Sequence, residues 1–201
     1  LRQMEARAGL AFIGSGACIA CRRHRFPVLE DDASDDLNLV LKVVSNGGRA
    51  LQVPNIGVYD YMDGDVNHQI QSRTRRVVRS LTTISRNAAI MNPLNHPDYA
   101  FCVISHKVLR WMSPLWLIGM LVASGALYSV PFYQGVFLAQ VGFYSLAALG
   151  FVLRHVSISR WPLLAIPLGV VIANIAFLRG LISFVVGRRM QIHEPARLGE
   201  Q

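Results

Sequence analysis

The chain has 201 residues, of which 52% are hydrophobic and 16% are charged, and its formal net charge is +8. A charged fraction this far below the roughly 25% of typical soluble domains argues against a chain that is soluble throughout. A basic excess is also common in nucleic-acid-binding proteins. Here, however, the basic residues largely stand beside apolar segments, where cations meet anionic lipid on the cytoplasmic side of a membrane. We therefore expect membrane lipids, and no nucleic acid, as partners. These residues are Lys107, Arg110, Arg154, Arg160, Arg188 and Arg189.

The N-terminal segment mixes glycines with apolar residues. Residues 9–22 predict a glycine-punctuated loop that leads into a buried strand, and Arg49–Pro54 predicts a second short strand. Cys18 and Cys21 have the spacing of metal ligands, but no second pair follows, so a strand is preferred to a zinc site. The chain begins without a signal peptide, and we expect it to be a fragment of a longer protein. We predict an α/β fold for residues 1–98.

An acidic segment, Glu30–Asp36, leads into a predicted helix. Ser34 is a suitable N-cap because its hydroxyl can accept a hydrogen bond from an amide of the first turn. Asp35 and Asp36 would then lie at the positive end of the helix dipole. The dipeptide Gly47-Gly48 is predicted to end the helix. An apolar stripe with helical spacing lies between these ends, at Leu37, Val40, Leu41 and Val44.

A basic segment follows at residues 66–91, which we predict to be helical. Four arginines stand close together in it: Arg73, Arg75, Arg76 and Arg79. Prolines at 93 and 97 break the chain, and residues 99–111 predict an amphipathic helix whose aromatic and basic residues suit a membrane interface.

The C-terminal part consists of apolar segments. Residues 111–153 contain no charged residue, and a span needs about 20 apolar residues, so we predict helices at 112–130 and 133–153 with a break near Pro131. A third apolar segment, 161–186, precedes a polar tail at 191–201 and completes a transmembrane region at 112–190. Three crossings from a cytoplasmic start would leave Arg188 and Arg189 outside, against the positive-inside tendency. Either the third segment does not cross or the tail is an exception.

Taken in order, these segments resemble the membrane-bound glycosyltransferase family 2, which includes cellulose, chitin and hyaluronan synthases. The resemblance covers essentially residues 10–125. Gly16–Phe26 is similar to the family's Gly-x-x-x-Ala-x-Arg-Arg-x-x-Phe strand, and Ser34-Asp35-Asp36 with Asn46–Arg49 is similar to its catalytic acidic motif and the helix end that follows. Arg75–Arg79 stands in the place of the Gln-x-x-Arg-Trp segment, and Ser105–Trp111 is similar to the run before the C-terminal helices.

The resemblance implies the C-terminal part of a glycosyltransferase A-type, Rossmann-like domain, followed by an interfacial helix and about three transmembrane helices. It implies an inverting enzyme of the bacterial inner membrane with its catalytic part in the cytoplasm. Asp36 would remove the proton of the acceptor hydroxyl, with Asp35 as a supporting carboxylate beside Ser34. Arg75, Arg76 and Arg79 would bind the nucleotide diphosphate that leaves. Gly16 would let the acceptor approach the backbone closely.

The implied partners are a nucleotide-sugar donor and a glycan or lipid-linked acceptor. A divalent cation, Mg²⁺ or Mn²⁺, is expected for the complete enzyme, on an Asp-x-Asp of the family's donor half. Asp63-Gly64-Asp65 has this spacing but follows the acidic motif, and we interpret it as a turn. We therefore predict no metal ligand in this fragment and no turnover by it alone. Because Arg76 and Ser80 replace the family's Gln and Trp, long-polymer synthesis is in doubt.

Two other functions fit parts of the pattern. A non-catalytic membrane subunit or degenerate remnant, assisting polysaccharide assembly or export, is favoured by the absence of the Asp-x-Asp half. A small transporter is disfavoured because few polar residues fall within the apolar segments. They are Gln134, Gln140, Asn174 and Arg179.

Overall fold

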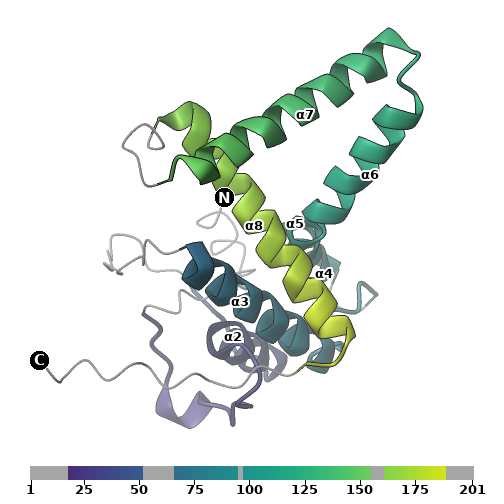
Figure 1. Cartoon of the computed structure of the whole chain (residues 1–201). Coiled ribbons are helices and arrows are strands. Elements are labelled where there is room, and N and C mark those ends of the chain that lie inside the picture. The colour runs from purple at the N-terminus through teal and green to yellow at the C-terminus, as the bar shows by residue number, and fades with distance from the viewer. Residues whose placement is uncertain (1–17, 52–65, 95–96, 155–160, 189–201) are drawn as a thin grey trace, which may run out of the picture. The chain divides into compact units, whose positions relative to one another are not determined.

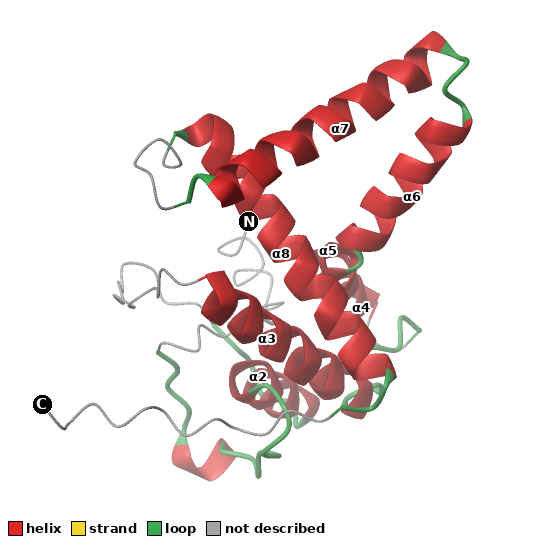
Figure 2. Cartoon of the chain, viewed as in Figure 1, coloured by secondary structure: helices red, strands yellow, loops and turns green. Residues whose placement is uncertain are grey.

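The computed structural model describes residues 18–51, 66–94, 97–154 and 161–188 (Figure 1). Most of these residues are helical, and none of them forms a strand (Figure 2). The helical elements are η1 (Arg23–Arg25), α2 (Asp35–Ser45), α3 (Val66–Arg86), α4 (Pro97–Val103), the π-helical η2 (Ile104–Val108), α5 (Leu109–Trp111), α6 (Ser113–Ala126), α7 (Pro131–Val152) and α8 (Pro162–Val185).

The predicted α/β fold is therefore wrong for the residues that the structure describes. The described part of the first expected strand, residues 18–22, is largely exposed irregular chain that leads into η1, and residues 49–51 of the second are irregular as well. A strand is stable only when neighbouring strands pair with it. The apolar side chains that are buried together in this part of the chain belong to helices α2 and α4 and to the turn after α3. Residues 9–17 and 52–54 lie outside the described residues, as do Gly16 and the segment Asp63–Asp65.

The chain divides into two compact units. The first contains residues 1–62, 75–107 and 183–201, and the second contains residues 63–74 and 108–182.

The core of the first unit joins α2 to α4 and to the residues that follow α3. Its buried members are Leu37, Leu41, Ile90, Tyr99, Cys102 and Val103. The apolar stripe predicted for α2 is confirmed, with Val44 packed at the edge of this core. Burial raises the pKa of the Tyr99 phenol above its ordinary value.

Helix α2 ends where the sequence predicts. Gly47 adopts a φ of 73°, and its N–H donates to the Val44 carbonyl at 2.9 Å, while the Gly48 N–H donates to the Val43 carbonyl at 2.8 Å. This pair of bonds is the Schellman arrangement, which requires a residue that tolerates the left-handed region.

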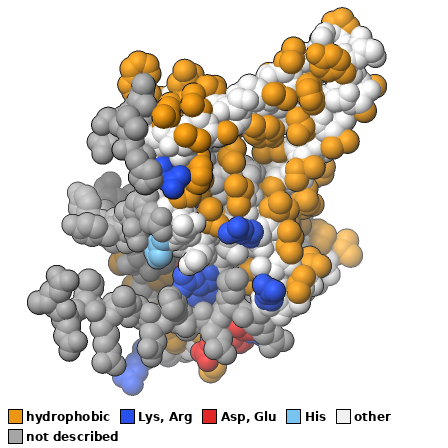
Figure 3. All heavy atoms as spheres, viewed as in Figure 1, with side chains coloured by type: hydrophobic (Ala, Val, Ile, Leu, Met, Phe, Trp, Pro, Cys, Tyr) orange, Lys and Arg blue, Asp and Glu red, His pale blue; other side chains and the backbone are white. Residues whose placement is uncertain are grey.

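The second unit contains the apolar helices. Gln140 of α7 donates to the Leu117 carbonyl of α6 at 3.2 Å, and the rings of Tyr128 and Phe137 meet edge to face. Helix α7 has 22 residues and α8 has 24, and both are long and apolar enough to cross a membrane. Helix α6 has only 14 residues, and it forms a pair with residues 97–111 that is bent by 57°. Figure 3 shows hydrophobic side chains over much of the surface of α6 and α7.

The segment predicted as an interfacial helix is helical throughout, as α4, η2 and α5. It is two-sided, because Phe101, Ile104 and Leu109 are exposed whereas Val103 and Trp111 are buried. Its position at a membrane interface stays a prediction.

Candidate functional site

The acidic start of α2 is held by one face of α3. Arg79, Thr83 and Arg86 follow one another at spacings of four and three residues, which places them on one side of the helix. Each of them bonds to a different part of the segment 31–35. We call these three residues of α3 and their partners in the segment 31–35 the acidic-loop clamp.

Arg79 makes the central contacts of the clamp. Its Nε donates to the Ala33 carbonyl at 2.7 Å, and its Nη2 donates to the Asp35 carboxylate at 3.0 Å. The side chain of Arg79 is 13% exposed and that of Asp35 is 60% exposed. The bond to the buried Ala33 carbonyl is therefore better shielded from water than the ion pair.

Thr83 and Arg86 extend the clamp toward the C-terminal end of α3. The Thr83 hydroxyl is fully buried and accepts a hydrogen bond from the Ser34 N–H at 2.8 Å. Arg86 forms a two-bond ion pair with the Asp32 carboxylate, in which Nη2 donates to Oδ2 at 2.7 Å. The segment before α2 is thus attached at three successive points.

The Asp36 carboxylate is oriented by its own neighbours. The Ser34 hydroxyl donates to Asp36 Oδ1 at 2.6 Å, and the Leu37 N–H donates to the same oxygen at 2.8 Å. Among the described residues, no group donates to Oδ2, and Asp36 is half-buried. One carboxylate oxygen is therefore fixed, while the second accepts no hydrogen bond from the described residues.

Ser34 is the N-cap residue of α2 by position, but the predicted cap bond is wrong. Its hydroxyl does not accept a bond from the first turn and instead donates to Asp36. The negative charge of Asp36 makes it the stronger acceptor for the hydroxyl proton.

A second cluster fixes Glu30 against α2. Lys42 Nζ donates to one oxygen of Glu30 at 2.6 Å, and Asn38 Nδ2 donates to the other at 2.5 Å. The hydrogen bond from Lys42, followed by that from Asn38, holds the pKa of Glu30 below its usual range. This cluster stabilises the turn that leads into α2.

The remaining predicted site residues lie apart from the clamp contacts. Arg75 and Arg76 belong to the turn of α3 before Arg79, where Arg75 is half-buried and Arg76 is exposed. Neither of these two arginines forms an ion pair with any residue that the structure describes. Gly16 lies outside the described residues. The structure therefore brings together Ser34, Asp35, Asp36 and Arg79, and leaves Arg76 facing solvent.

Sequence reasoning missed Asp32, Thr83 and Arg86. The signal was present as polar residues at positions 79, 83 and 86, on one face of a predicted helix. Thr83 and Arg86 bond to residues that lie 49 and 54 positions away in the sequence, so no local pattern could identify these contacts.

The described carboxylates do not fit a divalent cation. Within residues 18–51, 66–94, 97–154 and 161–188, no group of three His, Cys, Asp or Glu side chains could hold a metal ion. Two candidates at the start of α2, Asp32 and Asp35, are bonded to arginines.

Comparison with known proteins gives no family for this chain. No protein-family model, curated protein sequence or solved structure matches it.

Proposed function

We propose that this chain is the acceptor-side, membrane-anchored part of an inverting glycosyltransferase. The donor is a nucleotide-diphosphate sugar, and the acceptor is a glycan or a lipid-linked saccharide. The observation that carries this proposal is the Asp36 carboxylate, which has one oxygen held by Ser34 and Leu37 and the other open. A general base needs this combination of fixed orientation and an available oxygen.

In this proposal, Asp36 Oδ2 accepts the proton of the acceptor hydroxyl as that hydroxyl attacks the sugar carbon. The bond to the leaving diphosphate breaks in the same displacement. Asp35 does not touch the reacting atoms, because its carboxylate is paired with Arg79. It helps instead to place the backbone that carries Asp36.

The two central arginines of α3 take different roles. Arg79 is bound to Ala33 and Asp35 and is a positioning residue. Arg76 is exposed one turn earlier on the same helix, and it can meet the negative charge that develops on the diphosphate. Arg75, its neighbour, adds positive charge at the same turn.

The apolar helices provide the membrane anchor, since α7 is long and apolar enough to cross a membrane and α8 is at least as apolar. We place the enzyme in the bacterial inner membrane, with α2 and α3 on the cytoplasmic side where nucleotide sugars are found. The Mg²⁺ or Mn²⁺ of the complete enzyme would bind outside the described carboxylates.

The test is Asp36→Asn in the longest natural form of the protein, assayed for sugar transfer from nucleotide donors. We expect transfer to fall by about 10²-fold or more, because a positioned general base contributes roughly 10²–10⁴-fold. Asp31→Asn is the matched control, since the Asp31 side chain is exposed and only its backbone carbonyl contacts Arg79. Equal activity of the two variants would remove Asp36 from the mechanism.

A non-catalytic membrane subunit is the second candidate function. The pairing of Asp32 and Asp35 with arginines favours this function, because such ion pairs can hold a scaffold together without taking part in catalysis. Titration of the longest natural form with nucleotide sugars separates the two. Saturable donor binding with turnover supports the enzyme, whereas intact folding and assembly with no donor binding supports the subunit.

A further inference from the structure

We propose that α8 lies along the membrane surface, with α3 on one side and lipid on the other, and does not cross the bilayer. Composition alone predicts a span, because α8 has 24 residues and a mean hydropathy of 2.1 in its most apolar window. The contacts of α8 with a strongly basic helix indicate a different position.

In the second unit, the first half of α3 packs against the middle of α8. Ile70 of α3 is buried with Ile172 and Ala176 of α8. The Thr74 hydroxyl, also buried, donates to the Ala176 carbonyl at 3.2 Å. The buried residues of α8 are Leu164, Pro167, Ile172, Ala176 and Gly180, and the last three of them recur every four positions.

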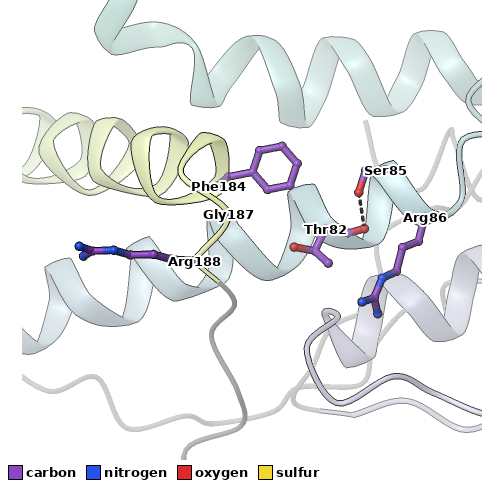
Figure 4. A pocket seen from close by; sticks show the side chains of 6 residues that line it. All are labelled: Thr82, Ser85, Arg86, Phe184, Gly187 and Arg188. Atoms are coloured by element: carbon purple, nitrogen blue, oxygen red, sulfur yellow. Dashed lines mark hydrogen bonds between the residues drawn. The ribbon is translucent and has the colours of Figure 1, made fainter.

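In the first unit, the last turn of α8 meets the C-terminal end of α3. Thr82, Ser85 and Arg86 of α3 line a cavity of about 170 Å³ together with Phe184, Gly187 and Arg188. Figure 4 shows the Phe184 ring pointing from α8 toward Ser85, while the Arg188 side chain extends away from the other five residues. Within each unit, therefore, a stretch of α3 accompanies a stretch of α8.

Helix α3 cannot enter the hydrocarbon region beside α8. It carries five arginines, at 73, 75, 76, 79 and 86, and charged side chains are costly in the bilayer core. The parts of α8 that have α3 beside them, around residues 168–176 and at the last turn, must then stay near the surface. Residues 162–167 alone extend only about 9 Å, far short of the ~30 Å hydrocarbon core.

The outward side of α8 suits a lipid surface. Ile175, Ile182 and Val185 are exposed, and Arg179 is exposed between them. In a helix parallel to the surface, the guanidinium of Arg179 reaches the phosphate headgroups directly. The partner of this face is thus a bilayer that contains anionic phospholipid.

The proposal also accounts for the basic residues after α8. Arg188 belongs to the same unit as α2 and α4, and an α8 that does not cross leaves it on the same side of the membrane as the chain before α8. If the bent pair of residues 97–111 and α6 forms one crossing and α7 the second, the conflict with the positive-inside tendency then disappears.

The test compares the two ends of α8. Arg154→Cys and Arg188→Cys are made singly in a background in which Cys18, Cys21 and Cys102 are replaced by serine, and intact cells are treated with a membrane-impermeant maleimide. We expect both positions to be labelled or both to be protected, and both to be labelled after detergent is added. Labelling of one position and protection of the other would show that α8 crosses, and would overturn the proposal.

A second measurement avoids replacing the buried Cys102. Topology reporters are fused after Arg154 and after Arg188 in the chain with its natural cysteines, and their activities are compared. Equal reporter activity supports an α8 parallel to the surface, and opposite activity excludes it.

Discussion

Replacing Arg79 with alanine should loosen the segment that carries Ser34 and Asp36. The substitution removes the bond from Nε to the Ala33 carbonyl at 2.7 Å and the ion pair with Asp35. A hydrogen bond from a charged donor is worth about 1.5–3 kcal/mol. The ion pair adds about 0–1 kcal/mol, because the Asp35 side chain is 60% exposed.

We therefore expect the local opening free energy of this segment to fall by about 2 kcal/mol. A loss of this size accelerates hydrogen exchange roughly 30-fold, since each 1.4 kcal/mol is a factor of ten. The amide to follow is Ser34 N–H, whose partner is the buried Thr83 hydroxyl. Exchange is measured by mass spectrometry on peptides that contain residues 31–37.

Two variants serve as controls. Arg76→Ala removes an exposed arginine from the preceding turn of α3 and should change the Ser34 protection by less than about 0.5 kcal/mol. Asp35→Asn removes only the ion pair and should cost less than about 1 kcal/mol. If Arg79→Ala and Arg76→Ala accelerate exchange equally, the clamp does not hold the segment and the reasoning is refuted.

The same pair of variants separates positioning from phosphate binding in the proposed enzyme. Arg79→Ala should lower kcat with little change in the donor KM, because it misplaces Asp36. Arg76→Ala should chiefly raise the donor KM, because it removes a cation that meets the diphosphate. A large rise in the donor KM of Arg79→Ala would return that arginine to the diphosphate.

Two further predictions concern the stability of α2. Gly47→Ala should cost about 1–2 kcal/mol, because Gly47 has a φ of 73°, which disfavours a Cβ. Gly48→Ala should be more destabilising, because a Cβ at Gly48 would lie 2.6 Å from Val43 Cγ1 and 2.7 Å from the Val43 carbonyl oxygen. Hydrogen exchange of α2 in the two variants checks the order. The hydrogen bond from Lys42 lowers the pKa of Glu30 in the folded state. Ionised Glu30 therefore stabilises the fold above its unfolded-state pKa of about 4.3, and this stabilisation is lost as the pH falls through the lower folded-state pKa. The exchange protection of α2 should therefore decrease in acid more steeply in the natural chain than in Glu30→Gln.

The features predicted correctly from sequence are those set by nearby residues. The stripe from Leu37 to Val44 and the glycines at 47 and 48 fix α2 within a few turns of chain, and the structure contains the predicted helix and its end. Pro131 occupies the first position of α7, where its lack of an N–H costs nothing, so the break before this helix could also be predicted.

The strand and the site contacts depended on residues distant in sequence. The apolar run at residues 18–22 has the composition of a strand, but no strand is present to pair with it in the described part of the chain. Likewise, the assignment of Arg79 to the diphosphate was implied by the resemblance, and it stays a prediction. The contact of Arg79 with Asp35, 44 residues earlier in the chain, could not be inferred from a local pattern.

The same limit applies to the apolar segments, because hydropathy measures a helix in isolation. Residues 161–186 satisfy the requirements for a span, and the structure places α8 within one residue of those bounds. Hydropathy does not take into account the helix that packs against the segment. Ile70 and Thr74 lie on α3, which carries five arginines, and they bury Ile172 and Ala176 of α8, which would otherwise face lipid. A segment of given hydropathy can therefore cross a bilayer or lie on it, depending on whether its packing partner is soluble in hydrocarbon. In our proposal the partner of α8 is α3, and its five arginines keep Arg188 on the same side of the membrane as the chain before α8.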